Sequence, residues 1–137
     1  MRIIVTGSRD WTDQRTLENA ILDHWANAAN RGHDLPVVVV HGAARGADRM
    51  AGKLARAWGK TYGDIEEERH PADWDRYGKS AGPVRNREMA KLGGDLCLAF
   101  TTLWPMERDG RPTGTGDMVN RCVKLGIPVN IFYRPLP

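Results

Sequence analysis

The chain has 137 residues, of which 41% are hydrophobic and 27% are charged, and this composition fits a single folded domain of common size. Its net charge of +3 is mild, so it suits an anionic ligand and disfavours nucleic acid as a partner. Cys97 and Cys122 lie in apolar stretches without metal-ligand spacing, so we predict no metal site, and no motif predicts a cofactor. The apolar runs are too short to span a bilayer and no signal peptide is visible, so we expect a cytoplasmic protein without membrane contact.

The first thirty-odd residues predict a strand, a glycine turn and a helix. Residues 2–6 (RIIVT) form the expected strand, which runs into Gly7-Ser8-Arg9, a candidate phosphate-binding turn. Thr12 or Asp13 can cap a helix that extends to about residue 30 and carries apolar residues at helical spacing. The following turn contains His33, which we interpret as a solvated loop histidine.

The most informative stretch is residues 37–48, VVVVHGAARGAD. Four consecutive valines predict a strand buried on both faces, and the turn after it leads into an amphipathic helix over residues 45–60. Backbone N–H groups at such a helix start favour anions. Arg45 opposes the helix dipole, which points to a functional role, and Asp48 can cap the helix or reach a ribose hydroxyl. At this point an ordinary tight turn without a ligand remains the alternative reading.

The middle of the chain combines cationic and aromatic residues. Residues 65–70 predict a weak edge strand, and residues 75–83 predict a polar loop. This loop contains Tyr77 and Lys79, and Trp74 immediately precedes it. Its cationic side chains, arginines among them, can pair with phosphate, and the aromatic rings can stack on a base, so the region suits nucleotide binding. A helix from Pro83 to about residue 92 carries Arg85 and Asn86 in its first turn. A solvated basic helix start is the alternative.

The last third predicts a buried strand over residues 95–100 and a long loop over residues 101–112. The length of this loop and its Trp104 favour a lid or an oligomer contact. Residues 113–117 (TGTGD) form the third glycine-rich helix start. The helix ends at Gly126, residues 127–132 form the last strand, and residues 134–137 are expected to be frayed.

This order of elements predicts an α/β protein, with a single Rossmann-like domain over residues 1–137. Its sheet should be mainly parallel and five-stranded, with helices on both faces. Ligands of such sheets bind at the carboxyl ends of the strands, near a topological switch point. Gly7, Gly42 and Gly114 all follow predicted strands at this edge, so their convergence predicts one pocket for an anionic ligand.

Four stretches together resemble the YspA-like branch of the SLOG superfamily, namely residues 7–9 (GSR), 41–48 (HGAARGAD), 71–74 (PADW) and 81–89 (AGPVRNREM). The resemblance extends from Met1 to about Phe132. It implies a Rossmann-like fold that binds nucleotides or nucleotide-derived molecules at the strand ends. Relatives include the "lonely guy" phosphoribohydrolases, which carry a Pro-Gly-Gly-x-Gly-Thr loop followed by a glutamate. The corresponding residues 112–117 here read PTGTGD, and no glutamate follows in the predicted helix.

We therefore expect a sensor or sequestering module for a nucleotide or nucleotide-derived signal molecule. The expected hydrogen-bond donors to phosphate are Gly7, Ser8, Gly42, Gly114, Thr115 and Gly116, and the arginines that neutralise its charge are Arg9, Arg45 and Arg85. Asp48 is expected to contact a ribose, and Trp74 or Tyr77 a base. His41, Lys79 and Asn86 are the remaining expected ligand contacts. The first alternative is a nucleoside monophosphate phosphoribohydrolase, whose candidate catalytic carboxylates are Asp48, Asp73 and Asp117. The second is a nucleic-acid-binding protein. A homodimer or higher homo-oligomer is a further expectation.

Overall fold

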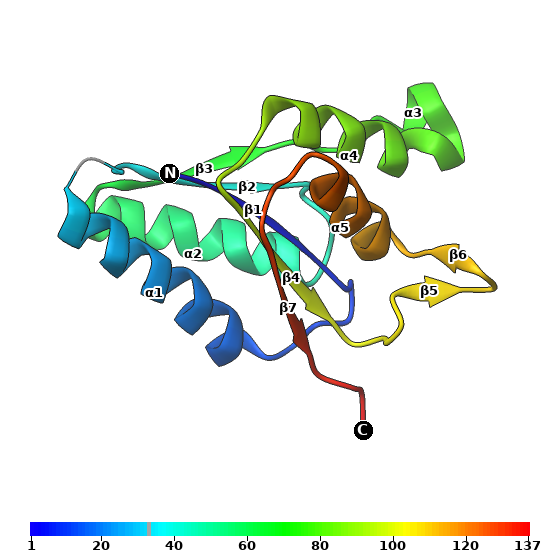
Figure 1. The fold of residues 1–137 in the computed structure, drawn as a ribbon, viewed down its shortest axis with the longest axis horizontal. Helices are drawn as coiled ribbons and strands as arrows, with labels where there is room; N and C mark the ends of the chain where they lie inside the picture. Colours follow the sequence, from blue (N-terminus) through cyan, green and yellow to red (C-terminus); the bar gives the residue numbers. More distant parts are fainter. Residues whose placement is uncertain (33) are drawn as a thin grey trace.

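The computed structural model describes residues 1–32 and 34–137, so the predicted loop histidine His33 lies outside the described residues. Figure 1 shows one twisted sheet with helices on both of its faces. Every neighbouring pair of strands in this sheet is parallel. The strand order is β3-β2-β1-β4-β7, with β1 (Arg2–Gly7), β2 (Val37–His41), β3 (Ile65–Arg69), β4 (Leu96–Thr101) and β7 (Val129–Tyr133). The predicted fold class is thereby confirmed.

Two helices cover each face of the sheet (Figure 1). They are α1 (Gln14–Arg31) and α2 (Ala47–Tyr62) on one face, and α4 (Ala81–Leu92) and α5 (Gly114–Lys124) on the other. Alternate residues of the strands supply the two cores, because successive side chains point to opposite faces. Ile3 packs in the core beneath α1 and α2, whereas its neighbour Ile4 packs with Met89 and Met118 of α4 and α5.

The polar segment after β3 differs from its prediction as a loop. It forms the short helix α3 (Trp74–Tyr77) and the 3₁₀ helix η1 (Gly78–Ser80), which lead into α4. Asp73 caps α3 by accepting a hydrogen bond from the N–H of Arg76 at 3.1 Å. Pro83 lies in the first turn of α4, where a missing N–H costs no helix bond. Residues 73–80 are all exposed, so Trp74 and Tyr77, although three residues apart, form no buried helical stripe.

Three further boundaries differ from the prediction. The segment after β4 contains a hairpin of β5 (Glu107–Arg108) and β6 (Arg111–Pro112) instead of an irregular loop. Helix α2 begins at Ala47, so Arg45 lies in the turn before the helix and not in its first turn. Arg134, at the start of the predicted frayed tail, donates its backbone N–H to the carbonyl of Thr101 at 3.0 Å.

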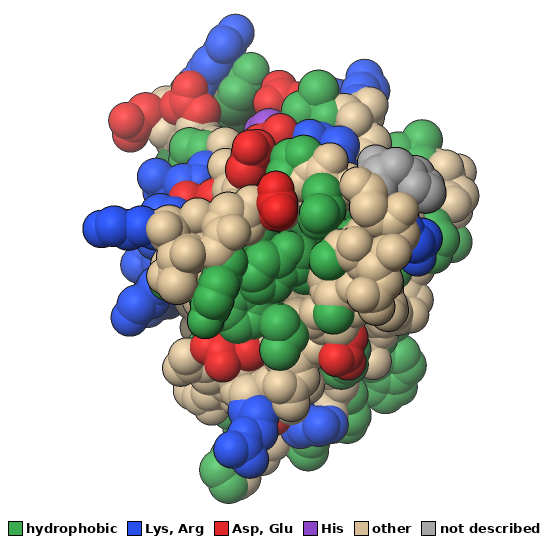
Figure 2. Space-filling model, turned by 90° about the vertical axis from the view of Figure 1, so that its left-hand side faces the viewer, with side chains coloured by type: hydrophobic (Ala, Val, Ile, Leu, Met, Phe, Trp, Pro, Cys, Tyr) green, Lys and Arg blue, Asp and Glu red, His purple; other side chains and the backbone are tan. Residues whose placement is uncertain are grey.

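The two ends of the sheet differ in character. The chain reverses its direction across the sheet between β1 and β4, so the topological switch point lies where these two strands end. The opposite end, where α1 and α2 end, faces the viewer in Figure 2 and has hydrophobic side chains gathered near its middle. There Trp25 stacks on Trp58 with ring centroids 5.6 Å apart, and Tyr62 is 68% exposed. Among the described residues, no helix is long and apolar enough to cross a membrane.

Candidate functional site

A cavity of about 1300 Å³ lies at the carboxyl ends of the strands. Its walls come from the turns after β1, β2 and β3, from α4, and from the segment that joins β6 to α5. These segments lie far apart in the sequence and meet here because parallel strands all end at the same edge of the sheet. The predicted convergence of Gly7, Gly42 and Gly114 is therefore confirmed as geometry, since all three line this cavity.

The cavity gathers most of the predicted site residues but not all of them. Its lining includes Gly7, Ser8, Arg9, Gly42, Arg45, Asp48, Trp74, Arg85, Asn86, Gly114, Thr115 and Asp117. The predicted residues outside its lining are His41, Asp73, Tyr77, Lys79 and Gly116. Lys79 is exposed on η1 and Asp73 caps α3, while Gly116 is buried where a Cβ atom would overlap the carbonyl of Met106. The roles assigned to the lining residues toward a ligand stay predictions.

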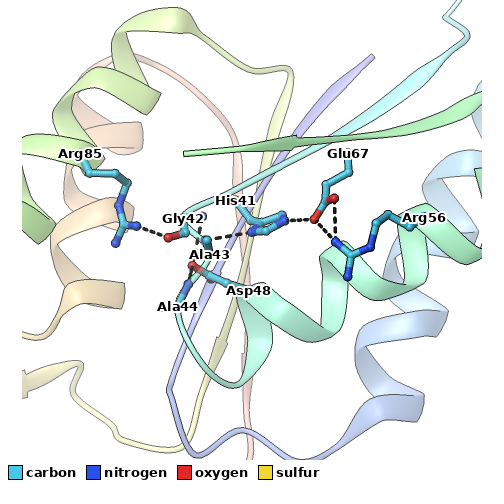
Figure 3. Close-up of polar contacts among 8 residues, drawn as sticks. All are labelled: His41, Gly42, Ala43, Ala44, Asp48, Arg56, Glu67 and Arg85. Atoms are coloured by element: carbon cyan, nitrogen blue, oxygen red, sulfur yellow. Dashed lines mark hydrogen bonds and ion pairs between the residues drawn. The ribbon is translucent and has the colours of Figure 1, made fainter. Parts of the chain in front are cut away.

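Asp48 is a buried carboxylate in the cavity wall, with only 5% of its surface exposed. Its Oδ2 accepts hydrogen bonds from the N–H groups of Gly42 (3.1 Å) and Ala44 (3.3 Å), as Figure 3 shows. Its Oδ1 has no such bond. Because every fully buried side-chain N or O atom of the described residues has a partner, Oδ1 is not fully buried, and we infer that it is accessible from the cavity that Asp48 lines. Burial raises the pKa of Asp48 from its usual 3.8 to about 6, even though Arg85 and Arg9 oppose this shift.

Arg85 ties the turn after β2 to helix α4. Its guanidinium donates hydrogen bonds to the carbonyls of Gly42 and His70, the latter at 3.2 Å, and to Oδ1 of Asn86 at 2.9 Å. A Cβ atom at position 42 would overlap this guanidinium, so a side chain there would require Arg85 to move away from the carbonyl of Gly42. The N–H of Gly42 is already bonded to Asp48, which corrects its predicted role as a phosphate donor.

Asn86 continues this network to α5. It is 5% exposed and donates from Nδ2 to the carbonyl of Gly114 (3.1 Å) and to Oδ2 of Asp117 (3.0 Å). The same Asp117 oxygen accepts a bond from Nε of Arg121 at 2.9 Å, one helical turn further on. Asp117 is thus held by two neighbours, so its carboxylate already serves to join α4 to α5.

His41 points away from the cavity, contrary to its predicted place in the ligand site. Figure 3 shows its ring directed toward Glu67 and Arg56. Its Nδ1 accepts the N–H of Ala43 (3.0 Å), so the proton lies on Nε2, which donates to Glu67 at 2.6 Å. Burial lowers the pKa of His41, which keeps the ring neutral. The alternation of side chains along a strand could have predicted this orientation of His41, because Val37, Val39 and His41 share the face of β2 that α2 covers.

The start of α5 offers free backbone donors. Thr113 caps the helix by accepting the N–H of Gly116 at 3.1 Å. The N–H groups of Gly114 and Thr115 have no hydrogen-bond acceptor in residues 1–32 and 34–137, and both residues line the cavity. In contrast, Ser8 uses its Oγ to accept the N–H of Thr102 at 3.0 Å. The start of α5 therefore offers two free backbone donors to an anion in the cavity.

Six arginines line the cavity, and three of them were not among the predicted ligand contacts. They are Arg9, Arg45, Arg49, Arg69, Arg85 and Arg108, against the carboxylates of Asp10, Asp48 and Asp117. In the described part of the chain, no carboxylate forms an ion pair with any of the six. The cavity therefore carries an uncompensated positive charge.

A parallel sheet with this strand order and a cavity across its switch point defines the Rossmann-like α/β class. The chain belongs to the family described as YAcAr (YspA, cpYpsA-related SLOG family), which matches residues 1–77. The resemblance drawn from the four sequence stretches is thereby confirmed. A relative, the Gene 61 protein of Mycobacterium phage D29, is 41% identical over 133 residues, which cover 96% of this chain and 95% of that protein. No solved structure matches the chain at a significant level.

Proposed function

We propose that this protein binds a nucleotide or nucleotide-derived signal molecule in the cavity at the strand ends. The observation that carries the proposal is the excess of unpaired arginines in a cavity of about 1300 Å³. That volume exceeds the range of roughly 300–1000 Å³ typical of small-molecule pockets, so a complete nucleotide can be accommodated. Membership of the SLOG family supports the same ligand class.

We assign a part of the ligand to each wall of the cavity. A phosphate is bound by the free N–H groups of Gly114 and Thr115, with neighbouring arginines neutralising its charge. A ribose hydroxyl donates to Oδ1 of Asp48, which is open to the cavity. The ring of Trp74, 52% exposed at the cavity, is placed to stack on a base. Mass spectrometry of small molecules released from the purified protein is the measurement that identifies the ligand.

Arg45→Ala is expected to weaken nucleotide binding about tenfold, because it removes a charge-assisted contact to phosphate. Arg45 is exposed and lies in the turn before α2, so the unfolding free energy should stay within about 0.5 kcal/mol of the wild type. Isothermal titration calorimetry with a panel of nucleoside mono-, di- and triphosphates measures the affinity. The matched control is Arg15→Ala, which removes an exposed arginine from α1, outside the cavity. Equal affinities for both variants would exclude Arg45 from the site, and a wild type that binds no nucleotide would refute the proposal.

A second candidate function is phosphoribohydrolase activity, which one observation favours. Asp48 carries a pKa of about 6 at the cavity, and such a carboxyl suits general acid or base chemistry. On this reading the wild type releases free base from a nucleoside monophosphate, and Asp48→Asn abolishes the release. Asp117→Asn should retain more activity, because the Asp117 carboxylate is bonded to Asn86 and Arg121. Chromatography measures the amount of free base released over time. Nucleotides that stay intact after long incubation would exclude phosphoribohydrolase activity.

Self-association also stays a proposal. Trp104, predicted to serve an oligomer contact, is 56% exposed and its ring lies 6.3 Å from that of Tyr133 in the edge strand β7. Ile131 of the same strand is 40% exposed. We propose this edge as the contact between two copies, since an exposed apolar strand edge is a ready surface for pairing.

A further inference from the structure

A second, smaller hollow of about 460 Å³ lies between α2 and the edge strand β3. Its walls are His41 and Ala43 from the end of β2, Arg49, Lys53 and Arg56 from α2, and Glu67 and Arg69 from β3. No residue predicted from the sequence as a ligand contact lines it except His41, and the ring of His41 is already bonded on both sides.

The charges of this hollow are unbalanced. Glu67 is its one acidic side chain, and both of its oxygens accept bonds from Arg56, at 2.7 and 2.6 Å (Figure 3). Arg49, Lys53 and Arg69 are exposed and have no ion-pair partner among the residues that the structure describes. Arg49 and Lys53 also stand one helical turn apart on α2, where like charges destabilise a helix. Three cations therefore face the hollow without serving the fold.

The hollow adjoins the main cavity. Ala43, Arg49 and Arg69 line both, so these residues form the shared rim. The shared residues place the hollow directly beside a ligand bound in the main cavity. The hollow contains no Phe, Tyr or Trp side chain, both nitrogens of its one imidazole are bonded, and its one carboxylate is bonded to Arg56, so its chemistry fits neither a base nor a metal ion.

We propose that this hollow is an anion subsite that binds a second phosphate group of the same ligand. The inference rests on the proposed function and narrows the ligand class to nucleotides that carry two phosphates at separate positions. Nucleoside bisphosphates and dinucleotides that begin with a phosphate both have this chemistry. Arg49 and Arg69 contact the ligand at the rim, and Lys53 binds the second phosphate within the hollow.

The test compares a one-phosphate probe with two probes that carry a second phosphate, and the nucleoside bisphosphate differs from the monophosphate in that phosphate alone. Isothermal titration calorimetry measures the affinity of the full chain for a nucleoside monophosphate, for the matching nucleoside bisphosphate and for a phosphorylated dinucleotide, with adenine and guanine series run in parallel. The wild type should bind the better two-phosphate probe at least about tenfold more tightly than the monophosphate, as expected for a charge-assisted contact.

Lys53→Ala is expected to reduce the affinity for the two-phosphate probe about fivefold and to leave the affinity for the monophosphate unchanged, because Lys53 lines only the second hollow. The matched control, Lys60→Ala, removes an exposed lysine of the same helix outside both hollows and should change neither affinity. If the monophosphate binds and the second phosphate adds nothing, or if both lysine variants behave alike, the subsite is refuted and the proposed function stands. If no probe binds, both are refuted.

Discussion

Asp48→Asn is expected to give a protein that is more stable than the wild type at neutral pH and that binds its nucleotide ligand less well. The amide oxygen can keep the hydrogen bonds from Gly42 and Ala44, while the buried negative charge disappears. The amide nitrogen then faces the cavity in place of Oδ1. It turns an acceptor into a donor, so it can no longer accept a bond from a ligand hydroxyl.

The stability gain should depend on pH in a defined direction. The pKa of Asp48 in the folded chain, about 6, lies above its usual 3.8, so the folded state holds this proton more tightly than the unfolded state. The protonated carboxyl of Asp48 makes its whole contribution to the unfolding free energy below about pH 4, and this contribution is lost as the pH rises through about 6. Above about pH 7 the ionised carboxylate costs the wild type about 3 kcal/mol, and the asparagine variant avoids this cost.

Chemical denaturation at several pH values between about 4 and 8 measures this difference in unfolding free energy. Subtracting the wild type from the variant cancels the titration of other groups, His41 among them. Asp117→Asn is the matched control, since Arg121 and Asn86 bind that carboxylate and its removal should bring no gain at any pH. A variant that is less stable than the wild type at pH 8 would contradict a net cost for the Asp48 charge.

Much of the fold was predictable from the sequence because its strands are buried. The valine run at residues 37–40 is a strand of the inner sheet, with Val37 and Val39 fully buried. The segment after β3 was not predictable in this way, because it is polar and glycine-rich and its helical turns bury none of residues 73–80, which leaves Trp74 and Tyr77 as its one short helical spacing. Its helix caps, such as Asp73, were the remaining evidence for these turns.

The position of the candidate site was predictable from the sequence, but its hydrogen-bond network was predictable only in part. A glycine after a strand indicates an edge of the sheet, and this rule placed Gly7, Gly42 and Gly114 correctly at the cavity. It does not reveal that Arg85, 43 residues away, donates to the carbonyl of Gly42. Nor does it reveal Glu67 as the partner of His41, because that pairing depends on the register of β2 against β3.

Gly46→Ala is expected to destabilise the protein by about 3 kcal/mol or more. Gly46 precedes α2 with φ at 77° and ψ at −126°, a conformation that side chains other than glycine rarely adopt. A Cβ atom there would overlap the carbonyl oxygen of Ser8 and lie 2.7 Å from the carbonyl of Arg9. Both obstacles are backbone atoms, so the turns after β1 and β2 must move apart. The two turns form adjacent walls of the cavity, so nucleotide binding should weaken in the same variant.

Gly63→Ala is the matched control, because Gly63 ends the same helix with φ at 73° and ψ at −175°. A Cβ atom at this position meets no other atom within 4 Å, so the variant bears the backbone strain alone, about 1 kcal/mol. Urea denaturation of both variants separates the two contributions, and circular dichroism confirms that each folds. The difference between them measures the close contact of α2 with the turn after β1. Equal losses for the two variants would show that this contact yields at no cost, and that the cavity walls are not fixed by it.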